Sequence, residues 1–372
     1  MKLTIERAAL LRSLAHVQSV VERRNTIPIL SNVLLEASEE GLGLTATDMD
    51  LAIHEKTHAQ VQEGGATTVP AHTFYDIVRK LPDGSEIELA LQGESGQLRL
   101  RAGRSNFFLP TLPREDFPST AASELPHSFT LQAPEAKNLI DRTRFAISTE
   151  ETRYYLNGIH MHAGTSEGAA VLRAVATDGH RLARVETALP EGAAEMPGII
   201  VPRKTVNELR KLIDEVEEGI QVSLSETRIC FTFGSIVLSS KLIDGTFPDY
   251  ERVIPTGNDK IMSVDCRSFA AAVDRVSTIS TEKSRAVKMT VQGDTLVLSA
   301  NSPEAGSASE EMPVQYEGPA LEIGFNSRYL LDIALQIEGE EAEFAMIDAS
   351  SPTVVRDLAD SSALYVLMPM RV

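Results

Sequence analysis

The feature that most constrains this chain is a segment that occurs three times. The copies are Gly41–Ile53 (GLGLTATDMDLAI), Val171–Arg184 (VLRAVATDGHRLAR) and, more faintly, Asp294–Ala308 (DTLVLSANSPEAGSA). When Ala46, Ala176 and Ala300 are aligned, the offsets between copies are 130 and 124 residues. This period is far longer than the roughly 20 to 50 residues of solenoid repeats. We therefore predict a triplicated domain, with domains at residues 1–126, 127–255 and 256–372.

Two further pairs of landmarks agree with the first offset. Val-Pro precedes a helical pattern at Pro70 and again at Pro202, and Phe-Pro occurs at Pro118 and again at Pro248. The spacings are 132 and 130 residues. A proline-rich stretch over residues 110–126 is typical of a linker between the first two domains.

Each third is expected to contain two amphipathic helices and roughly six to eight strands, many of them in hairpins, an α+β arrangement. The helices are identified by apolar residues at helical spacing: Leu10, Leu14, Val17 and Val21; Phe74, Ile77, Val78 and Leu81; Leu139, Ile140, Thr143 and Ile147 within Pro134–Ile147; Val206, Leu209, Leu212 and Ile213; Phe269, Val273 and Val276 within Cys266–Ile279; Leu330, Ile333, Ala334 and Ile337.

Composition favours a globular protein. Apolar residues make up 42% of the 372 residues, but no uncharged apolar run reaches the roughly 18 residues that would span a bilayer. Glu6, Arg7 and Arg12 interrupt the region where a signal peptide needs an apolar core, so we expect a cytoplasmic protein. Cys230 and Cys266 are far apart and have no metal-ligand spacing, so neither a disulfide nor a zinc site is expected.

Domain size suggests what three copies can form. A domain of this length has a radius of gyration of about 14 Å, and hence a diameter of about 35 Å. Three such spheres in a ring leave a hole of about 5 Å, and six leave about 35 Å, by geometry from that estimate. Duplex DNA is about 20 Å across. One chain therefore cannot encircle DNA, whereas a head-to-tail dimer of six domains can.

The charge distribution is compatible with a DNA-encircling ring despite a net charge of −18. Acidic runs fall in turns, and many basic residues fall on the expected helices, which could touch phosphates. An equally good interpretation is that these are ordinary solvated helix faces. The basic residues are Arg7, Arg12, Arg79, Lys80, Lys137, Arg142, Arg144, Arg203, Lys204, Arg210, Lys211, Arg267, Arg275 and Arg328.

Several motifs together resemble the bacterial DNA polymerase III beta subunit, or sliding clamp, family. They are TTVP at 67–70, RYYLNG at 153–158, TDGHRLA at 177–183, VPRK at 201–204, SKLIDGTFPDY at 240–250 and MPMR at 368–371. The resemblance implies three clamp domains, each with two antiparallel sheets and two helices on the inner surface, and a head-to-tail dimeric ring. It also implies a non-catalytic processivity factor that slides on double-stranded DNA. Its implied partners are a second copy of itself, the replicative polymerase, the clamp loader and other proteins with a clamp-binding motif.

Three sites follow from the resemblance. The partner-peptide cleft would use Leu156, Thr177, Gly179, His180, Arg181, Leu182, Pro248, Arg252, Val253, Tyr329, Val366, Met368, Pro369, Met370 and Arg371. The DNA contacts would be Arg24, Tyr154 and Tyr155, while His72 and Thr73 depart from the basic residues frequent in the family. The ring interface would place Phe107 and Leu109 against Thr278 and Ile279.

The alternative is a hydrolase or metal enzyme that uses Asp178 and His180. Asp-Gly also occurs at Asp83 and Asp244, however, which favours turn chemistry at Asp178. His160 and His162 share one strand face without a third ligand at suitable spacing, so we expect no metal site. Neither the P-loop motif nor G-x-G-x-x-G is present, so we expect no cofactor and no nucleotide hydrolysis by this chain.

Overall fold

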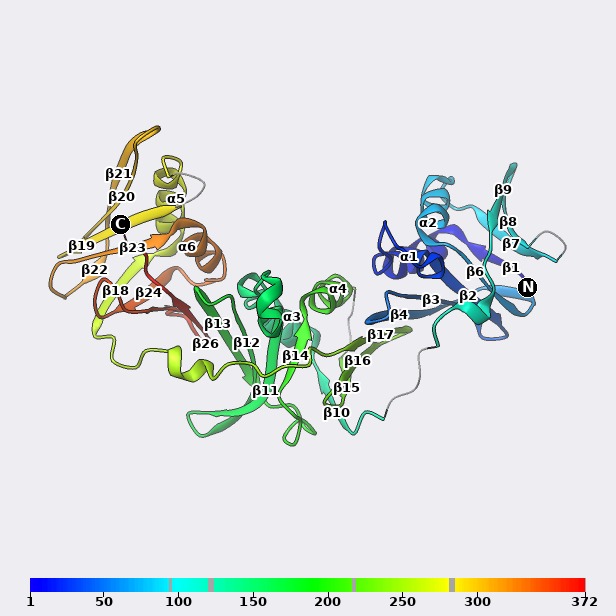
Figure 1. Ribbon diagram of the computed structural model, residues 1–372, viewed down its shortest axis with the longest axis horizontal. Coiled ribbons are helices and arrows are strands. Elements are labelled where there is room, and N and C mark those ends of the chain that lie inside the picture. Colours follow the sequence, from blue (N-terminus) through cyan, green and yellow to red (C-terminus); the bar gives the residue numbers. More distant parts are fainter. Residues whose placement is uncertain (94–95, 120–123, 216–218, 281–284, 372) are drawn as a thin grey trace. The chain divides into compact units, whose positions relative to one another are not determined.

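The structure is a computed structural model that describes residues 1–93, 96–119, 124–215, 219–280 and 285–371. The chain folds into two compact units (Figure 1). Unit 1 comprises Met1–Ala133, Glu191–Met196 and Asn207–Leu242, and unit 2 comprises Pro134–Pro190, Pro197–Val206 and Ile243–Val372. Helix α4 (Arg203–Ile213) begins in a segment of unit 2 and ends in a segment of unit 1.

Unit 1 contains two antiparallel sheets. The first has the strand order β5-β1-β7-β8-β9, and the second has the order β10-β15-β16-β17-β4-β3-β2-β6. The strands are β1 (Lys2–Glu6), β2 (Asn32–Ser38), β3 (Gly41–Thr47), β4 (Leu51–Thr57), β5 (Gln60–Glu63), β6 (Gly65–Pro70), β7 (Glu86–Gln92), β8 (Gln97–Ala102), β9 (Ser105–Pro110), β10 (His127–Leu131), β15 (Ile220–Leu224), β16 (Arg228–Phe233) and β17 (Ile236–Lys241).

The two helices of the first repeat pack together on the second sheet. They are α1 (Arg7–Gln18) and α2 (Ala71–Lys80), and α1 also contacts β3 and β4. Leu10, Leu14, Val17, Phe74 and Val78 are fully buried, which confirms the two apolar stripes expected from the sequence. Short 3₁₀ turns precede β2 at Pro28–Ser31 and follow β9 at Arg114–Asp116.

Unit 2 also contains two antiparallel sheets. Their strand orders are β14-β11-β12-β13-β26-β25-β24-β18-β22 and β21-β20-β19-β23. The strands are β11 (Gly158–Ser166), β12 (Ala169–Thr177), β13 (Arg181–Ala188), β14 (Ile199–Pro202), β18 (Lys260–Asp265), β19 (Ala286–Gln292), β20 (Thr295–Ser302), β21 (Gly306–Pro313), β22 (Gln315–Tyr316), β23 (Leu321–Asn326), β24 (Glu341–Met346), β25 (Thr353–Asp357) and β26 (Asp360–Leu367).

The helices of unit 2 are α3 (Ala133–Asp141), α5 (Cys266–Ser277) and α6 (Ser327–Ala334), with α5 packed on α6 and β20. Short 3₁₀ segments lie at Arg144–Ala146, Glu151–Leu156 and Tyr250–Val253. The helix expected over Pro134–Ile147 is shorter than predicted. The Thr143 hydroxyl donates to the Leu139 carbonyl at 2.5 Å, and such back-bonding competes with helix continuation.

In both units, one sheet crosses an expected domain boundary. Strand β4 of the first repeat pairs with β17 of the second, and β13 of the second pairs with β26 of the third. These two pairings join the same strand positions of successive repeats. None of the helices in the part of the chain that the structure describes is long and apolar enough to cross a membrane.

Candidate functional site

The second half of the central repeat motif, residues 177–181, forms a tight turn in unit 2. The Thr177 hydroxyl donates to the Arg181 carbonyl at 2.7 Å, and the Gly179 amide donates to the Thr177 hydroxyl at 3.1 Å. One carboxylate oxygen of Asp178 accepts from the amides of His180 and Arg181 at 2.9 and 3.1 Å. The Asp178 carboxylate is therefore occupied by the backbone, as expected for turn chemistry.

Glycine is favoured at position 179, because its φ is 87°, a left-handed value. A Cβ there would lie 2.5 Å from the Arg153 Nη1 atom, so the Arg153 side chain would have to move. The sibling turn in unit 1 repeats the same bonds, with the Met49 amide donating to Thr47 and the amides of Asp50 and Leu51 donating to Asp48. Met49 adopts a φ of 82° and is 52% exposed.

Arg181 fixes this turn to the rest of unit 2. Its guanidinium donates to Asp178 at 3.1 Å, to Asp332 at 2.5 Å and to the Phe145 carbonyl at 2.6 Å. It also stacks over the Tyr329 ring at 4.3 Å, a cation–π distance. Because the side chain is 9% exposed and fully bonded, Arg181 acts as a structural anchor rather than as a free charge.

A cleft of about 340 Å³ lies beside this turn, entirely within unit 2. Its lining includes nine of the fifteen residues expected there: Leu156, Thr177, Gly179, Arg181, Leu182, Pro248, Val253, Val366 and Met368. It also includes four residues that were not assigned to it: Arg153, Tyr155, Asp249 and Tyr250. All four lie inside the motifs RYYLNG and SKLIDGTFPDY, so a signal for them was present.

The other six expected residues lie outside this lining. The His180 ring stacks near Tyr329 with ring centroids 6.3 Å apart. Arg252 forms an ion pair with Asp249 at 2.7 Å and is 84% exposed. The remaining residues belong to the C-terminal segment, which consists of Pro369, Met370 and Arg371.

Two backbone hydrogen bonds hold the C-terminal segment in place. The Met368 amide donates to the His180 carbonyl at 2.9 Å, and the Met370 amide donates to the Gly324 carbonyl at 2.8 Å. Met368 remains 40% exposed. The cleft thus has a buried apolar floor that includes Leu182 and Val366, and a flexible methionine at its rim.

A polar network supports the cleft wall from behind. The His162 Nδ1–H donates to the Ala163 carbonyl at 2.8 Å, which leaves Nε2 to accept from the Tyr250 hydroxyl at 2.8 Å. Arg173 is 9% exposed and pairs with Glu186 and Glu251, each at 2.6 Å. Burial raises the pKa of Tyr250, so its hydroxyl stays a donor.

His160 gives this network a pH dependence. Burial, together with His162, lowers the His160 pKa to about 4. Between pH 4 and the unfolded value near 6.5, the unfolded state binds more protons, so stability falls as pH falls. The His160→Phe variant should keep the stacking on Phe247, whose centroid is 4.7 Å away, and remove this loss. We expect the apparent free energy of unfolding of the parent, measured in urea, to drop by about 2 kcal/mol more than that of the variant between pH 7 and pH 4.5. Equal drops in both proteins would contradict this assignment.

The expected DNA-contacting residues lie in both units. Arg24 is exposed in a loop after α1 in unit 1. Tyr154, which is 54% exposed, and Tyr155 pack edge to face in unit 2, with centroids 5.7 Å apart. Tyr155 also lines the cleft. The His72 ring is bonded to the Val21 carbonyl at 2.9 Å, and Thr73 is exposed.

Most basic residues on the helices have carboxylate partners. Arg12 pairs with Glu215 at 2.8 Å, Lys211 with Glu208 at 2.7 Å and Arg210 with Asp214 at 2.7 Å. Arg142 contradicts the expectation of a phosphate-facing side chain, because it is 4% exposed and bonded to Asp360 and Tyr365. The pairs of Lys211 and Arg210 join residues three and four positions apart, whereas periodicity could not reveal the long-range pairs of Arg12 and Arg142.

The expected interface residues lie on an edge strand and at the end of a helix. Phe107 and Leu109 are in β9, the edge strand of its sheet, where Leu109 is 3% exposed and Phe107 is half-buried. Thr278 is exposed at the end of α5, and Ile279 follows it half-buried. Phe108, which was not singled out, is 56% exposed on β9.

The candidate Asp178–His180 dyad is not assembled in the structure. The Asp178 carboxylate bonds to backbone amides and Arg181, whereas the His180 ring faces Tyr329. The rings of His160 and His162 stack 4.9 Å apart. Among the residues that the structure describes, no group of three or more His, Cys, Asp or Glu side chains could hold a metal ion.

Sequence models of three domains of the DNA polymerase III beta subunit match the chain. The N-terminal domain model matches residues 1–121, the central domain model residues 130–249 and the C-terminal domain model residues 251–371.

Similar proteins cover the whole chain. A beta sliding clamp of Caulobacter vibrioides is 54% identical over 372 residues, and that of Escherichia coli K12 is 40% identical over 374 residues, with 100% of both chains covered in each case. A DnaN sliding clamp from Bartonella birtlesii bound to griselimycin superimposes with a TM-score of 0.97 at 50% identity. A DNA polymerase sliding clamp from Caulobacter crescentus gives a TM-score of 0.96 at 53% identity. Both structures cover 100% of this chain and are themselves covered fully.

Proposed function

Because this chain belongs to the DNA polymerase III beta subunit family, we propose that it is a sliding clamp of bacterial DNA replication. Two copies form a head-to-tail ring of six domains around duplex DNA. The ring slides along the duplex and tethers the replicative polymerase and other replication and repair proteins, which gives them processivity. The observation that carries this proposal is the strand pairing that joins successive repeats.

Each repeat joins the next through equivalent strands. In unit 1, Ile53 of β4 is opposite Leu238 of β17, and in unit 2, Ala183 of β13 is opposite Tyr365 of β26. Strand β21 of the third repeat is equivalent to β4 and β13, and strand β9 of the first repeat is equivalent to β17 and β26. Both β21 and β9 are edge strands of their sheets. A long exposed edge favours further pairing. We therefore propose that β21 of one subunit pairs with β9 of the next, which closes the ring through a heterologous contact.

The register of this closing pair follows from the repeat. Ala308 is opposite Ala300 in its hairpin, as Ala183 is opposite Ala176, so Ala308 takes the place of Ala183. Phe107 follows a hairpin glycine with positive φ by four residues, as Leu238 does. We propose that Ala308 lies opposite Phe107 of the partner subunit. The residues of the two equivalent pairs are 0% exposed, namely Ile53, Leu238, Ala183 and Tyr365. Phe107 and Ala308 are half-buried in the single chain.

A helix contact accompanies each strand junction. Ser19 caps the C-terminus of α1, and its hydroxyl donates to Glu208 of α4 at 2.6 Å. Thr278 caps α5 in the same way, and Asp76 lies six residues after Pro70 just as Glu208 lies six after Pro202. We propose that Thr278 faces Asp76 of the partner subunit, which would place Thr278 and Ile279 at the ring interface.

The cleft in unit 2 is the proposed docking site for partner peptides. An extended peptide would place apolar side chains over Leu182, Val366 and Pro248, with Met368 adjusting to different partners. The whole set of fifteen residues, including those outside the lining, remains our proposal for this site. Arg24, Tyr154 and Tyr155 are the proposed DNA contacts.

We propose that the protein has no catalytic role of its own and works in the cytoplasm, where the polymerase and the clamp loader supply the chemistry. We propose that the chain is divided into domains 1–126, 127–255 and 256–372. A ring needs only weak phosphate contacts, because closure rather than affinity prevents escape. That requirement fits the helices of the described part of the chain, on which most basic residues form ion pairs.

The Phe107→Asp variant tests the ring directly. Burying a carboxylate in place of an aromatic ring should cost about 3 kcal/mol or more at each interface, because the charge has no partner there. Sedimentation at micromolar concentration should show a dimer for the parent and a monomer of 40.5 kDa for the variant. Leu358→Asp is the matched control, because Leu358 is 51% exposed in the β25–β26 turn and belongs to neither of the two proposed edge strands. A Phe107→Asp protein that remains dimeric would contradict the proposed closing pair.

A further inference from the structure

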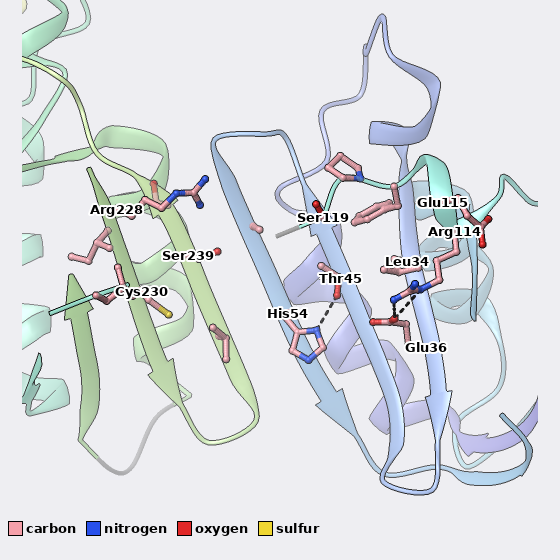
Figure 2. Close-up of a pocket in the computed structure, with 17 residues that line it drawn as sticks. Leu34, Glu36, Thr45, His54, Arg114, Glu115, Ser119, Arg228, Cys230 and Ser239 are labelled. Carbon is pink, nitrogen blue, oxygen red and sulfur yellow. Dashed lines mark hydrogen bonds and ion pairs between the residues drawn. The ribbon is translucent and has the colours of Figure 1, made fainter. Parts of the chain in front are cut away.

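A second and larger pocket lies within unit 1, on the sheet that joins the first and second repeats. Its volume is about 720 Å³, which is within the range of ligand sites. Figure 2 shows its floor, which β16 and β17 share with β4, β3 and β2, and a wall that includes Arg114, Glu115 and Ser119. None of the residues that the sequence predicts for a functional site lines this pocket.

The floor of this pocket repeats the floor of the cleft in unit 2. Across β16, β17 and β4, the residues Cys230, Ser239 and Ala52 lie opposite one another in a row. The equivalent strands β25, β26 and β13 carry the row Val354, Val366 and Leu182. A second row, Val237, His54 and Thr45, likewise corresponds to Leu364, Arg184 and Val175. The walls also correspond, since Pro118 lines one site and Pro248 the other.

The side chains at these positions explain why the pocket is open. In unit 2, Val175, Leu182, Val354, Leu364 and Val366 are buried in one apolar cluster. In unit 1, the same positions carry Thr45, Ala52, Cys230, Val237 and Ser239, which are smaller or polar. Apolar groups have therefore been replaced by two hydroxyls, a thiol and a methyl group. The result is a site of the same construction with a polar lining that can bond to a polar ligand.

The charges at the two ends of the pocket differ. At one end, Arg228 is directly opposite Lys241 in the β16–β17 ladder, an arrangement of like charges that is unfavourable by itself. Lys241 is paired with Asp50 at 2.9 Å, whereas the Arg228 guanidinium has no bonding partner among the residues that the structure describes. At the other end, Arg114 is neutralised by Glu36 at 2.7 Å. The lining contains two arginines and two glutamates, Glu36 and Glu115, so its formal charges balance. Arg228 is the arginine without a carboxylate partner among the described residues, which makes its end of the pocket locally positive.

From this geometry, we propose that the unit 1 pocket is a second docking groove for an extended peptide, with a carboxylate side chain that binds Arg228. The proposal rests on the proposed function, because it assumes that the equivalent cleft in unit 2 binds an extended peptide. The peptide's carboxylate accepts from the Arg228 guanidinium, and its polar groups bond to Thr45 and Ser239. This groove selects against the apolar peptides that suit unit 2, so one subunit can hold two partners of different chemistry.

Cys230 on the pocket floor provides a test in the intact protein. The probes are two tripeptides, N-acetyl-Cys-Val-Glu amide and N-acetyl-Cys-Val-Lys amide, each supplied as its mixed disulfide with 2-mercaptoethanol. The Cys230 thiolate forms a disulfide with the peptide sulfur and releases 2-mercaptoethanol, and added 2-mercaptoethanol reverses the exchange. Mass spectrometry gives the labelled fraction at equilibrium. Cys266 is buried, and burial raises its pKa to about 11, so the Cys230→Ser variant should take no label.

We expect that releasing half of the bound glutamate peptide takes about tenfold more 2-mercaptoethanol than releasing half of the lysine peptide. This ratio corresponds to one charge-assisted hydrogen bond. Arg228→Gln should remove this preference. Ser239→Val, which restores the residue found in unit 2, should weaken retention of both peptides while the protein still folds. Equal retention of the two peptides by the parent, or a preference that survives Arg228→Gln, would overturn the proposal.

Binding of an apolar clamp-binding peptide to the unit 2 cleft is measured on the same samples. If the cleft fails to bind but the preference at Cys230 remains, the proposed function is wrong and the unit 1 groove stands as a site. If the unit 2 cleft binds the apolar peptide and Cys230 shows no preference for the glutamate peptide, only the proposal of a second groove is wrong.

Discussion

Deleting residues 368–372 should reduce the affinity for a clamp-binding peptide by about 100-fold or more, because hot-spot apolar anchors contribute about 2 kcal/mol or more each. The deletion removes Met368 from the cleft rim and the amide that donates to His180. It also leaves the new chain end one residue after Val366, which belongs to the cleft floor. Fluorescence anisotropy with a labelled peptide from the replicative polymerase measures the affinity.

The same deletion should leave the dimer unchanged, because neither β9 nor β21 includes the deleted residues. Sedimentation provides this control, and it separates loss of the cleft from loss of the fold. Met368→Ala is the matched point variant, and it should lower the affinity by about tenfold through lost apolar contact. An unchanged peptide affinity in the truncated protein would rule out the cleft assignment.

Local sequence patterns predicted the elements that depend on local periodicity. The stripe of Leu10, Leu14 and Val17 gave α1, and that of Phe74 and Val78 gave α2, because a helix must bury one face. The turn at Asp178 was also predictable, since Asp and Gly have a local reason to be there. The end of α3 was not, because it depends on a hydroxyl of Thr143 that could have pointed to solvent.

Contacts between distant segments could not be predicted from the residues alone. Arg142 looks like any basic helix residue until Asp360, more than two hundred residues away, is seen to pair with it. The junctions β4–β17 and β13–β26 depend on edge pairing, whose register no local pattern specifies. Most of the cleft came from family motifs rather than from periodicity. Tyr250 was missed because an aromatic residue after Phe-Pro-Asp could equally belong to the core.

The repeat offers a reason why one cleft is apolar and the other pocket polar. After triplication, each junction starts with the same strand positions, and single substitutions such as valine to serine change what the junction can bind. At the junction in unit 2, Val366 and Leu182 keep an apolar floor, while Ser239 and Ala52 open the junction in unit 1. The turn that contains Gly179 in unit 2 and the turn that contains Met49 in unit 1 likewise have the same backbone conformation and differ in their side chains.

We propose that this protein holds DNA by encircling it. The most direct measurement is retention of the loaded protein on a circular plasmid at high salt, before and after a restriction enzyme cuts the plasmid once. Screening should remove weak phosphate contacts but leave a closed ring in place. The Arg24→Ala variant should load in smaller amounts and be retained equally well once loaded. We expect the protein to stay on the circular plasmid and to be lost when the DNA becomes linear. Protein that remains on the linear DNA at the same level, with its ends free, would contradict it.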